Sequence, residues 1–243
     1  MIIKNGDEES LLEVELSDSV GIQSVEKALV VLDALADRAG RYPATLAELT
    51  RRTGFHRSSV NRCIVSLTRA GYVQVDPETQ RYSLGPKVLR LAEQFVSKTD
   101  VINRARPHLA RLRDVTEETA FFSLLVNEQR VVVAQEESRL GLRRSMEIGA
   151  PVPLYCSSSS KAILAFAPPS LVERILSVPL PPCGPGASTD PKVILKQLRE
   201  IRERGFALGQ DEMVEGAGAV SAPVFNDRSQ VIGAIGIGGP VTR

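Results

Sequence analysis

The chain has 243 residues, of which 43% are hydrophobic and 24% charged, and its formal net charge is +1. These are the proportions of a globular protein with room for two domains, each with its own core. No run approaches the roughly 18 apolar residues of a membrane helix, and the acidic N-terminus lacks the basic and apolar regions of a secretory signal. We therefore expect a cytoplasmic protein that makes no contact with a membrane.

The expected secondary structure begins after an acidic tail. Residues 1–20 carry one lysine and six acidic residues with little periodicity, which predicts a disordered segment. Thr45 and Glu48 have the spacing of a capping box, so a helix should begin there and end at Gly54. The order of elements over residues 21–85 predicts a winged helix-turn-helix. These elements are helices at 25–36, 46–53 and 56–70, and a hairpin with strands at 72–75 and 81–84.

A linker helix and a second domain are expected to follow. Pro86 can open a helix over residues 86–100, which we assign as the linker. Pro107 should break or kink the next helix, over residues 101–117. Interspersed helices and strands with a closing hairpin favour an α+β domain over residues 101–243 with a central antiparallel sheet. Its expected elements are strands at 119–126, 130–135, 144–148, 219–225 and 230–237, and helices at 157–167, 170–177 and 191–204.

A stretch without acidic residues marks the first domain. Between residues 49 and 75 there are five arginines and no acid, a pattern typical of a surface that meets a polyanion. On the third helix Val60, Cys63 and Ile64 should face the core, whereas polar side chains face outward. Arginine and asparagine can bind base edges in the major groove, and serine can bind phosphates. The alternative is that these side chains are only solvated. The candidate DNA-binding residues are Arg51, Arg52, Arg57, Ser58, Ser59, Asn61, Arg62, Arg69 and Arg81.

The cysteines and histidines do not suggest catalysis. Cys63, Cys156 and Cys183 are far apart and lack the spacing of a zinc site or disulfide framework, so we expect reduced thiols. His56 and His108 are the only histidines, and no pattern pairs either with a nucleophile. A phosphate-binding loop of the GxxxxGK[ST] type is absent from the sequence. We therefore expect no enzyme, no metal and no cofactor.

A run of serines in the second domain has two interpretations. Residues 157–160 are all serine and stand at an expected helix start, where free backbone N–H groups and hydroxyls favour an anion. The alternative is ordinary helix capping, for which a single serine suffices. Asp211 and Glu212 could likewise belong to a pocket or to a solvated loop.

Several separated segments resemble the IclR family of bacterial regulators. They are GIQSVEKALVVLDAL at 21–35, the helix-turn-helix and wing at 45–85, GAPVPLYCSSSSKAILAF at 149–166, and the glycine-rich end at 204–240. The resemblance implies a homodimer or homotetramer that binds palindromic double-stranded operator DNA and represses or activates transcription. It also implies a GAF-like C-terminal domain that binds a small organic acid. The alternative is a C-terminal domain that binds a protein partner.

The resemblance also implies where the effector binds. Some family members carry Asp, Cys and Ser side chains where this chain has Gly209, Ala219, Gly236 and Gly238. These positions cannot make the corresponding hydrogen bonds here and should leave more room, which predicts an effector bulkier than pyruvate or glyoxylate. The implied effector-binding residues are Ser158, Ser159, Gly209, Gln210, Asp211, Ala219, Gly236 and Gly238.

Overall fold

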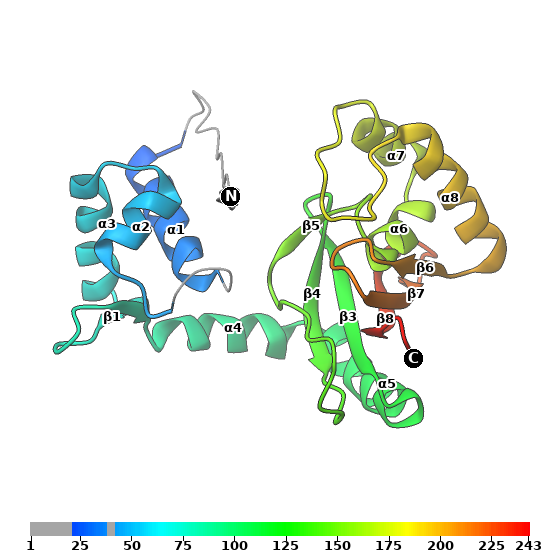
Figure 1. Cartoon of the computed structure of the whole chain (residues 1–243), viewed down its shortest axis with the longest axis horizontal. Coiled ribbons are helices and arrows are strands. Elements are labelled where there is room, and N and C mark those ends of the chain that lie inside the picture. The colour runs from blue at the N-terminus through cyan, green and yellow to red at the C-terminus, as the bar shows by residue number, and fades with distance from the viewer. Residues whose placement is uncertain (1–20, 38–41) are drawn as a thin grey trace, which may run out of the picture. The chain divides into compact units, whose positions relative to one another are not determined.

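The computed structural model describes residues 21–37 and 42–243. Contacts divide the chain into two units, one ending at Phe95 and one beginning at Val96 (Figure 1). The acidic tail expected over residues 1–20 lies outside the described residues. In the described part of the chain, no helix combines the length and the apolar character that a membrane span requires.

The first unit has the order of elements that the sequence predicts. Its helices are α1 (Gln23–Ala36), α2 (Leu46–Thr53) and α3 (Arg57–Arg69), and its hairpin pairs β1 (Val73–Val75) with β2 (Tyr82–Leu84). The core joins all three helices to the hairpin, because Val31, Leu49, Val60 and Val73 are each at most 2% exposed. Burial of one apolar stripe from each helix fixes their mutual arrangement.

The capping box of α2 is confirmed. The Glu48 backbone N–H donates to the Thr45 hydroxyl at 3.2 Å, and the Thr45 backbone N–H donates to the Glu48 carboxylate at 2.7 Å. The helix ends at Gly54, which has a φ of 66°. Glycine adopts this left-handed conformation without the steric cost that a Cβ would bring.

Two helices, α4 (Lys87–Lys98) and α5 (Asp100–Thr116), lead into the second unit. Of the break or kink predicted at Pro107, the break is wrong, because α5 runs through this residue. Proline removes one N–H bond to the carbonyl of Asn103 four residues earlier. Asn103 and Pro107 are both exposed. Water can therefore bond the carbonyl that Pro107 leaves unpaired.

The second unit is built on a six-stranded sheet in the order β5-β4-β3-β8-β7-β6, and every neighbouring pair is antiparallel. The predicted α+β class with an antiparallel sheet is therefore confirmed. The strand expected at 144–148 is wrong, since only Ile148 makes a single bridge, to Val132. The strands are β3 (Thr119–Val126), β4 (Gln129–Glu136), β5 (Pro151–Pro153), β6 (Ala207–Gln210), β7 (Ala217–Phe225) and β8 (Val231–Pro240).

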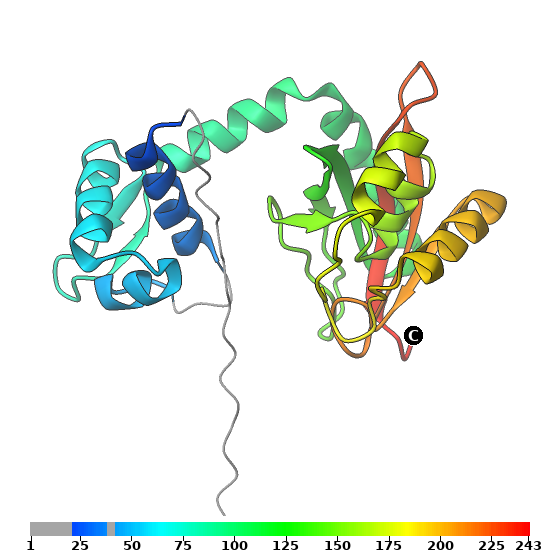
Figure 2. The ribbon, with the colours of Figure 1, turned by 90° about the horizontal axis from the view of Figure 1, so that it is seen from above.

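Helices cover both faces of this sheet (Figure 2). On one face α5 packs on Ala120 and Phe122 of β3. On the other face lie α6 (Ser158–Ala165), α7 (Pro169–Leu176) and α8 (Pro191–Arg204), and α6 is buried along its whole length. Because side chains alternate along a strand, Phe121 and Ser123 face the α6 side.

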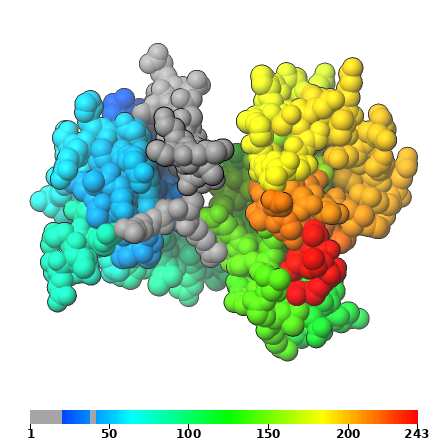
Figure 3. Space-filling view, viewed as in Figure 1, coloured from blue at the N-terminus to red at the C-terminus, as the bar shows by residue number. Residues whose placement is uncertain are grey.

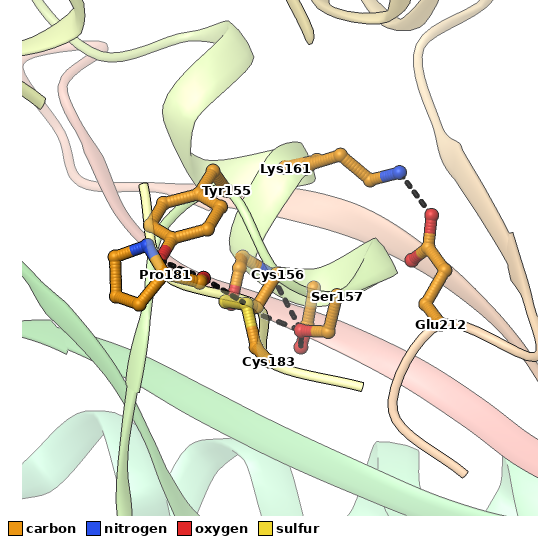
Figure 4. Close-up of a disulfide and its surroundings, with 9 residues drawn as sticks. Tyr155, Cys156, Ser157, Lys161, Pro181, Cys183 and Glu212 are labelled. Carbon is orange, nitrogen blue, oxygen red and sulfur yellow. Dashed lines mark hydrogen bonds and ion pairs between the residues drawn. A yellow bond between two sulfur atoms is a disulfide. The ribbon is translucent and has the colours of Figure 1, made fainter. Parts of the chain in front are cut away.

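A disulfide corrects the prediction of reduced thiols. Cys156 and Cys183 are bonded, with their Cα atoms 5.9 Å apart, whereas Cys63 is free and buried. Cys183 lies on the loop of residues 178–190, which runs along the surface against the segment of residues 211–216 (Figure 3). This loop folds back to Cys156, directly before α6 (Figure 4). The spacing of the cysteines did not reveal the pairing, because it depends on how this loop packs.

Candidate DNA-binding helix and ligand pocket

The two faces of α3 have the predicted composition. Val60 and Ile64 are at most 2% exposed and pack in the core, as does Cys63. The side chains of Asn61 and Arg62 are exposed on the opposite side. Ser58 and Arg69 are exposed as well, and Ser59 is half-buried. The helix therefore presents a polar and basic surface that its own domain does not cover.

Two of the candidate arginines have partners inside the first unit. Arg52 donates to the Ala34 carbonyl at 2.9 Å, which joins α2 to the end of α1. Arg81 donates to the Pro43 carbonyl at 2.8 Å and lies 3.6 Å from the Glu48 carboxylate. The bonds from Thr45, followed by the charges of Arg81 and Arg52, lower the pKa of Glu48. Arg51 and Arg57 are exposed at the surface.

A cavity of about 50 Å³ lies at the start of α6, between that helix, the sheet and the segment of residues 212–219. Of the effector-binding residues that the resemblance implies, four line it: Ser158, Ser159, Gly209 and Ala219. Gln210 and Gly238 line a more open hollow of about 400 Å³ along β6, β7 and β8, which Gly209 and Ala219 also line.

Asp211 and Gly236 line neither of these two hollows. The Asp211 carboxylate accepts a 2.6 Å hydrogen bond from the Gly216 backbone N–H and so closes the turn before β7. Gly236 pairs with Phe121 of β3 and Ser221 of β7 inside the sheet.

The extra space expected beside Gly209, Gly236 and Gly238 is occupied by other side chains. A Cβ added at Gly209 would lie 2.6 Å from the Glu212 carboxylate. A Cβ at Gly238 would lie 2.6 Å from the Met146 methyl group, and one at Gly236 would lie 2.5 Å from the Ser221 hydroxyl. Neighbouring side chains therefore take the space, and the prediction of a roomier pocket is wrong at these three positions. The cavity corresponds to only a few water molecules, since one water needs roughly 10–15 Å³.

The serines at the start of α6 differ in their contacts. Ser157 is the N-cap, and its hydroxyl accepts the backbone N–H of Ser160 at 3.3 Å. Ser158 and Ser159, each 2% exposed, line the cavity. The Ser158 hydroxyl lies 3.0 Å from that of Ser221. Capping therefore accounts for Ser157 and leaves two buried serines at the cavity.

Glu212 belongs to the pocket and is paired. Its carboxylate accepts from the Lys161 ammonium group of α6, and the two side chains are 12% and 4% exposed (Figure 4). Lys161 also donates to the Gln197 side-chain oxygen at 3.1 Å. Burial raises the pKa of Glu212, and the nearby Lys161 charge partly offsets that rise.

Sequence reasoning missed two arginines of this pocket. Arg130 on β4 is 8% exposed, and Arg144 on the segment after β4 is half-buried. Both line the cavity. Loss of hydration, followed by the charge of Arg144, lowers the pKa of Arg130 to about 10, so it stays protonated at neutral pH. For Arg130 the sequence did hold a signal, because an arginine stands among the apolar residues of an expected strand.

Comparisons with known proteins agree with this architecture. Residues 24–77 match the IclR helix-turn-helix domain, and residues 93–243 match the bacterial transcriptional regulator IclR C-terminal domain. The HTH-type transcriptional regulator BhcR of Paracoccus denitrificans is 33% identical over 227 residues, covering 93% of this chain and 80% of that protein.

Solved structures give the same result. An IclR transcriptional regulator from Alicyclobacillus acidocaldarius has a TM-score of 0.80 and 27% identity, covering 91% of this chain and 89% of that one. An IclR homologue from Microbacterium hydrocarbonoxydans, solved with 4-hydroxybenzoate, shares the fold at a TM-score of 0.76 and 21% identity, with 90% of each chain covered. The chain therefore belongs to the IclR family of bacterial transcriptional regulators.

Proposed function

We propose that this regulator is controlled by a small organic acid that binds at the start of α6 and changes the affinity of α3 for operator DNA. The observation that carries the proposal is the cavity itself, where Ser158 and Ser159 are buried beside two arginines. A helix start with hydroxyls and nearby cations favours a carboxylate. The relative that holds 4-hydroxybenzoate, itself an organic acid, adds support.

The proposed DNA contacts follow from exposure on α3. Asn61 and Arg62 are the side chains with the donors and acceptors for base edges in the major groove. Ser58, Ser59, Arg57, Arg69 and Arg51 are placed for phosphates, which position a protein on DNA without specifying sequence. Arg52 and Arg81 would contribute chiefly by holding the domain together, because each already donates to a backbone carbonyl.

Control of DNA binding follows from linkage. If the effector changes operator affinity by some factor, DNA must change effector affinity by the same factor. In the chain the two units are joined through α4, which runs without a break from Lys87 to Lys98. The helix is a covalent route by which a change in one unit can reach the other.

Self-association and a cytoplasmic location complete the proposal. A palindromic operator has two-fold symmetry, which a homodimer or homotetramer matches. On α4 the apolar side chains of Leu89 and Leu91 are 73% and 54% exposed, and contact with a second copy would remove them from water. The operator lies on the bacterial chromosome, so the protein would act in the cytoplasm.

A thermal-shift titration of the full-length protein against a panel of small organic acids tests the sensor. A ligand that binds the native state raises the melting temperature with concentration. The Ser158→Ala/Ser159→Ala double variant should lose that rise, whereas Ser170→Ala, at an exposed serine on α7, should keep it. If no acid shifts the protein, the acid sensor is refuted and a protein partner becomes the candidate for the second unit.

A further inference from the structure

The cavity at the start of α6 has two positive charges without an acidic partner. Arg130 is 8% exposed, and its Nε atom is buried with no hydrogen-bond partner among the described residues. No ion pair within the described chain involves Arg130 or Arg144. Arginines this far from water normally face a carboxylate, because an unpaired buried charge is costly.

The acid that lines the cavity does not cancel these charges. Glu212 is the sole acidic residue of the described lining, and it pairs with Lys161. That pair is neutral as a whole, so Arg130 and Arg144 remain in excess. Both arginines line the same cavity, and repulsion by the Arg144 charge contributes, after burial, to the lowered pKa of Arg130. The side chains that line the pocket therefore carry a net charge of about +2 by this residue count.

A second set of donors points to a second anionic group. The backbone N–H groups of Ser158 and Ser159 have no partner among the described residues, whereas those of Ser160 and Lys161 bond to Ser157. Free N–H groups in the first turn of a helix bind carboxylates and phosphates well. A ligand with a single charge could satisfy the serine N–H groups or the two arginines, and would leave the other set unmatched.

We infer that the effector of this pocket is a short dianion, with one anionic group at the Ser158 and Ser159 N–H groups and the other between Arg130 and Arg144. This inference rests on the proposed sensor function and names its ligand class. The cavity is small, about 50 Å³, which favours a ligand with only a few non-hydrogen atoms between the two groups. A dicarboxylic acid of two to four carbons meets these requirements.

The test compares diacids with monoamides of the same shape. Isothermal titration of the full-length protein uses oxalate, malonate and succinate, each against its monoamide (oxamate, malonamate and succinamate), at one ionic strength. Replacing one carboxylate by an amide keeps the size and removes one charge. At least one diacid should bind ten-fold or more tightly than its monoamide, because only the diacid offers a charged group to both the serine N–H groups and the arginine pair.

Variants test whether Arg130 and Arg144 are the residues that recognise the second charge of the diacid. Arg144→Gln should reduce the preference for the diacid to less than three-fold. Arg139→Gln is the matched control on the same segment, since its side chain is 78% exposed and absent from the cavity lining. Arg130→Met should raise the melting temperature of the ligand-free protein, because it removes an unpaired buried charge, and it should abolish the diacid preference. A structural arginine would give the opposite change in melting temperature.

Two results separate this inference from the proposed function. If a monoamide or another monoacid binds as tightly as every diacid, the dianion is refuted while an acid sensor stands. If no diacid or monoacid binds at all, both fail. An unchanged diacid preference in Arg144→Gln and Arg130→Met would also overturn the inference, because the charge would then be recognised elsewhere.

Discussion

Replacing Lys161 by methionine should destabilise the second unit and make its stability depend on pH. Lys161 is 3% exposed and holds the Glu212 carboxylate, so the variant leaves that carboxylate buried without its ion-pair partner. Breaking one side of a buried ion pair costs about 3–5 kcal/mol. Because Glu212 is 12% exposed through the cavity, we expect a value near the lower limit, about 3 kcal/mol.

The pH dependence has a definite sign. Burial already raises the pKa of Glu212 above its ordinary 4.5, and loss of Lys161 removes the main effect that lowers it. A carboxyl group with a raised pKa in the folded state binds its proton more tightly when folded. The loss of stability should therefore be larger at pH 8 than at pH 5, and should shrink as the pH falls.

Urea unfolding of the full chain at pH 8 and pH 5, followed by circular dichroism, measures both effects. Hydrogen exchange of a β3 peptide reports the second unit separately. Lys196→Met is the matched control, because Lys196 pairs with Glu200 at 3.9 Å on the exposed side of α8. An exposed pair of this kind contributes about 0.3–0.5 kcal/mol.

A rescue variant makes the reasoning refutable. Lys161→Met/Glu212→Gln should recover most of the lost stability, because the carboxylate that the first substitution leaves without its partner is no longer charged. Equal losses at both pH values, or a double variant as unstable as Lys161→Met alone, would show that the ion pair is not the cause.

Three further predictions concern other parts of the chain. Cys183→Ser should lower the melting temperature of the second unit, and added reductant should do the same to the wild-type protein. The disulfide joins residues 27 positions apart, and a cross-link of this length contributes about 3–4 kcal/mol in the chain-entropy account. Equal melting temperatures with and without reductant would refute this. Arg62→Ala should weaken operator binding by about 1–3 kcal/mol in fluorescence anisotropy and relax preference at one base pair; wild-type binding would remove Arg62 from base reading. Thr45→Ala should cost about 1 kcal/mol in urea unfolding, through the lost cap of α2; an unchanged midpoint would contradict the capping role.

The fold features that sequence predicted are those set by local patterns. The spacing of Thr45, Glu48 and Gly54 determines where α2 begins and ends without help from distant residues. The alternation of buried and exposed positions along α3 is equally local. By contrast, β5 and β6 have three and four residues and exist because they pair with β4 and β7. Strands this short carry too little periodicity to be identified alone.

The site divides in the same way. The serines at the start of α6 stand in one run and could be found from the sequence. Arg130 and Arg144 come together with them only after β4 and its following segment have folded against α6. The pairing of Lys161 with Glu212 joins residues 51 positions apart. The resemblance named Gly209 and Ala219, which line the cavity, but it could not show that Glu212 and Met146 occupy the space beside the glycines.

The measurement that tests the central claim most directly is operator affinity with and without the bound acid. The duplex would be the one that the protein selects from a random pool, and the ligand the acid that binds most tightly in the titration. The account predicts that saturating ligand changes the operator Kd by about five-fold or more, and that DNA changes the ligand Kd by the same factor. In Ser158→Ala/Ser159→Ala the effect should disappear. An unchanged operator Kd in the wild-type protein, at a ligand concentration shown to fill the pocket, would contradict the account.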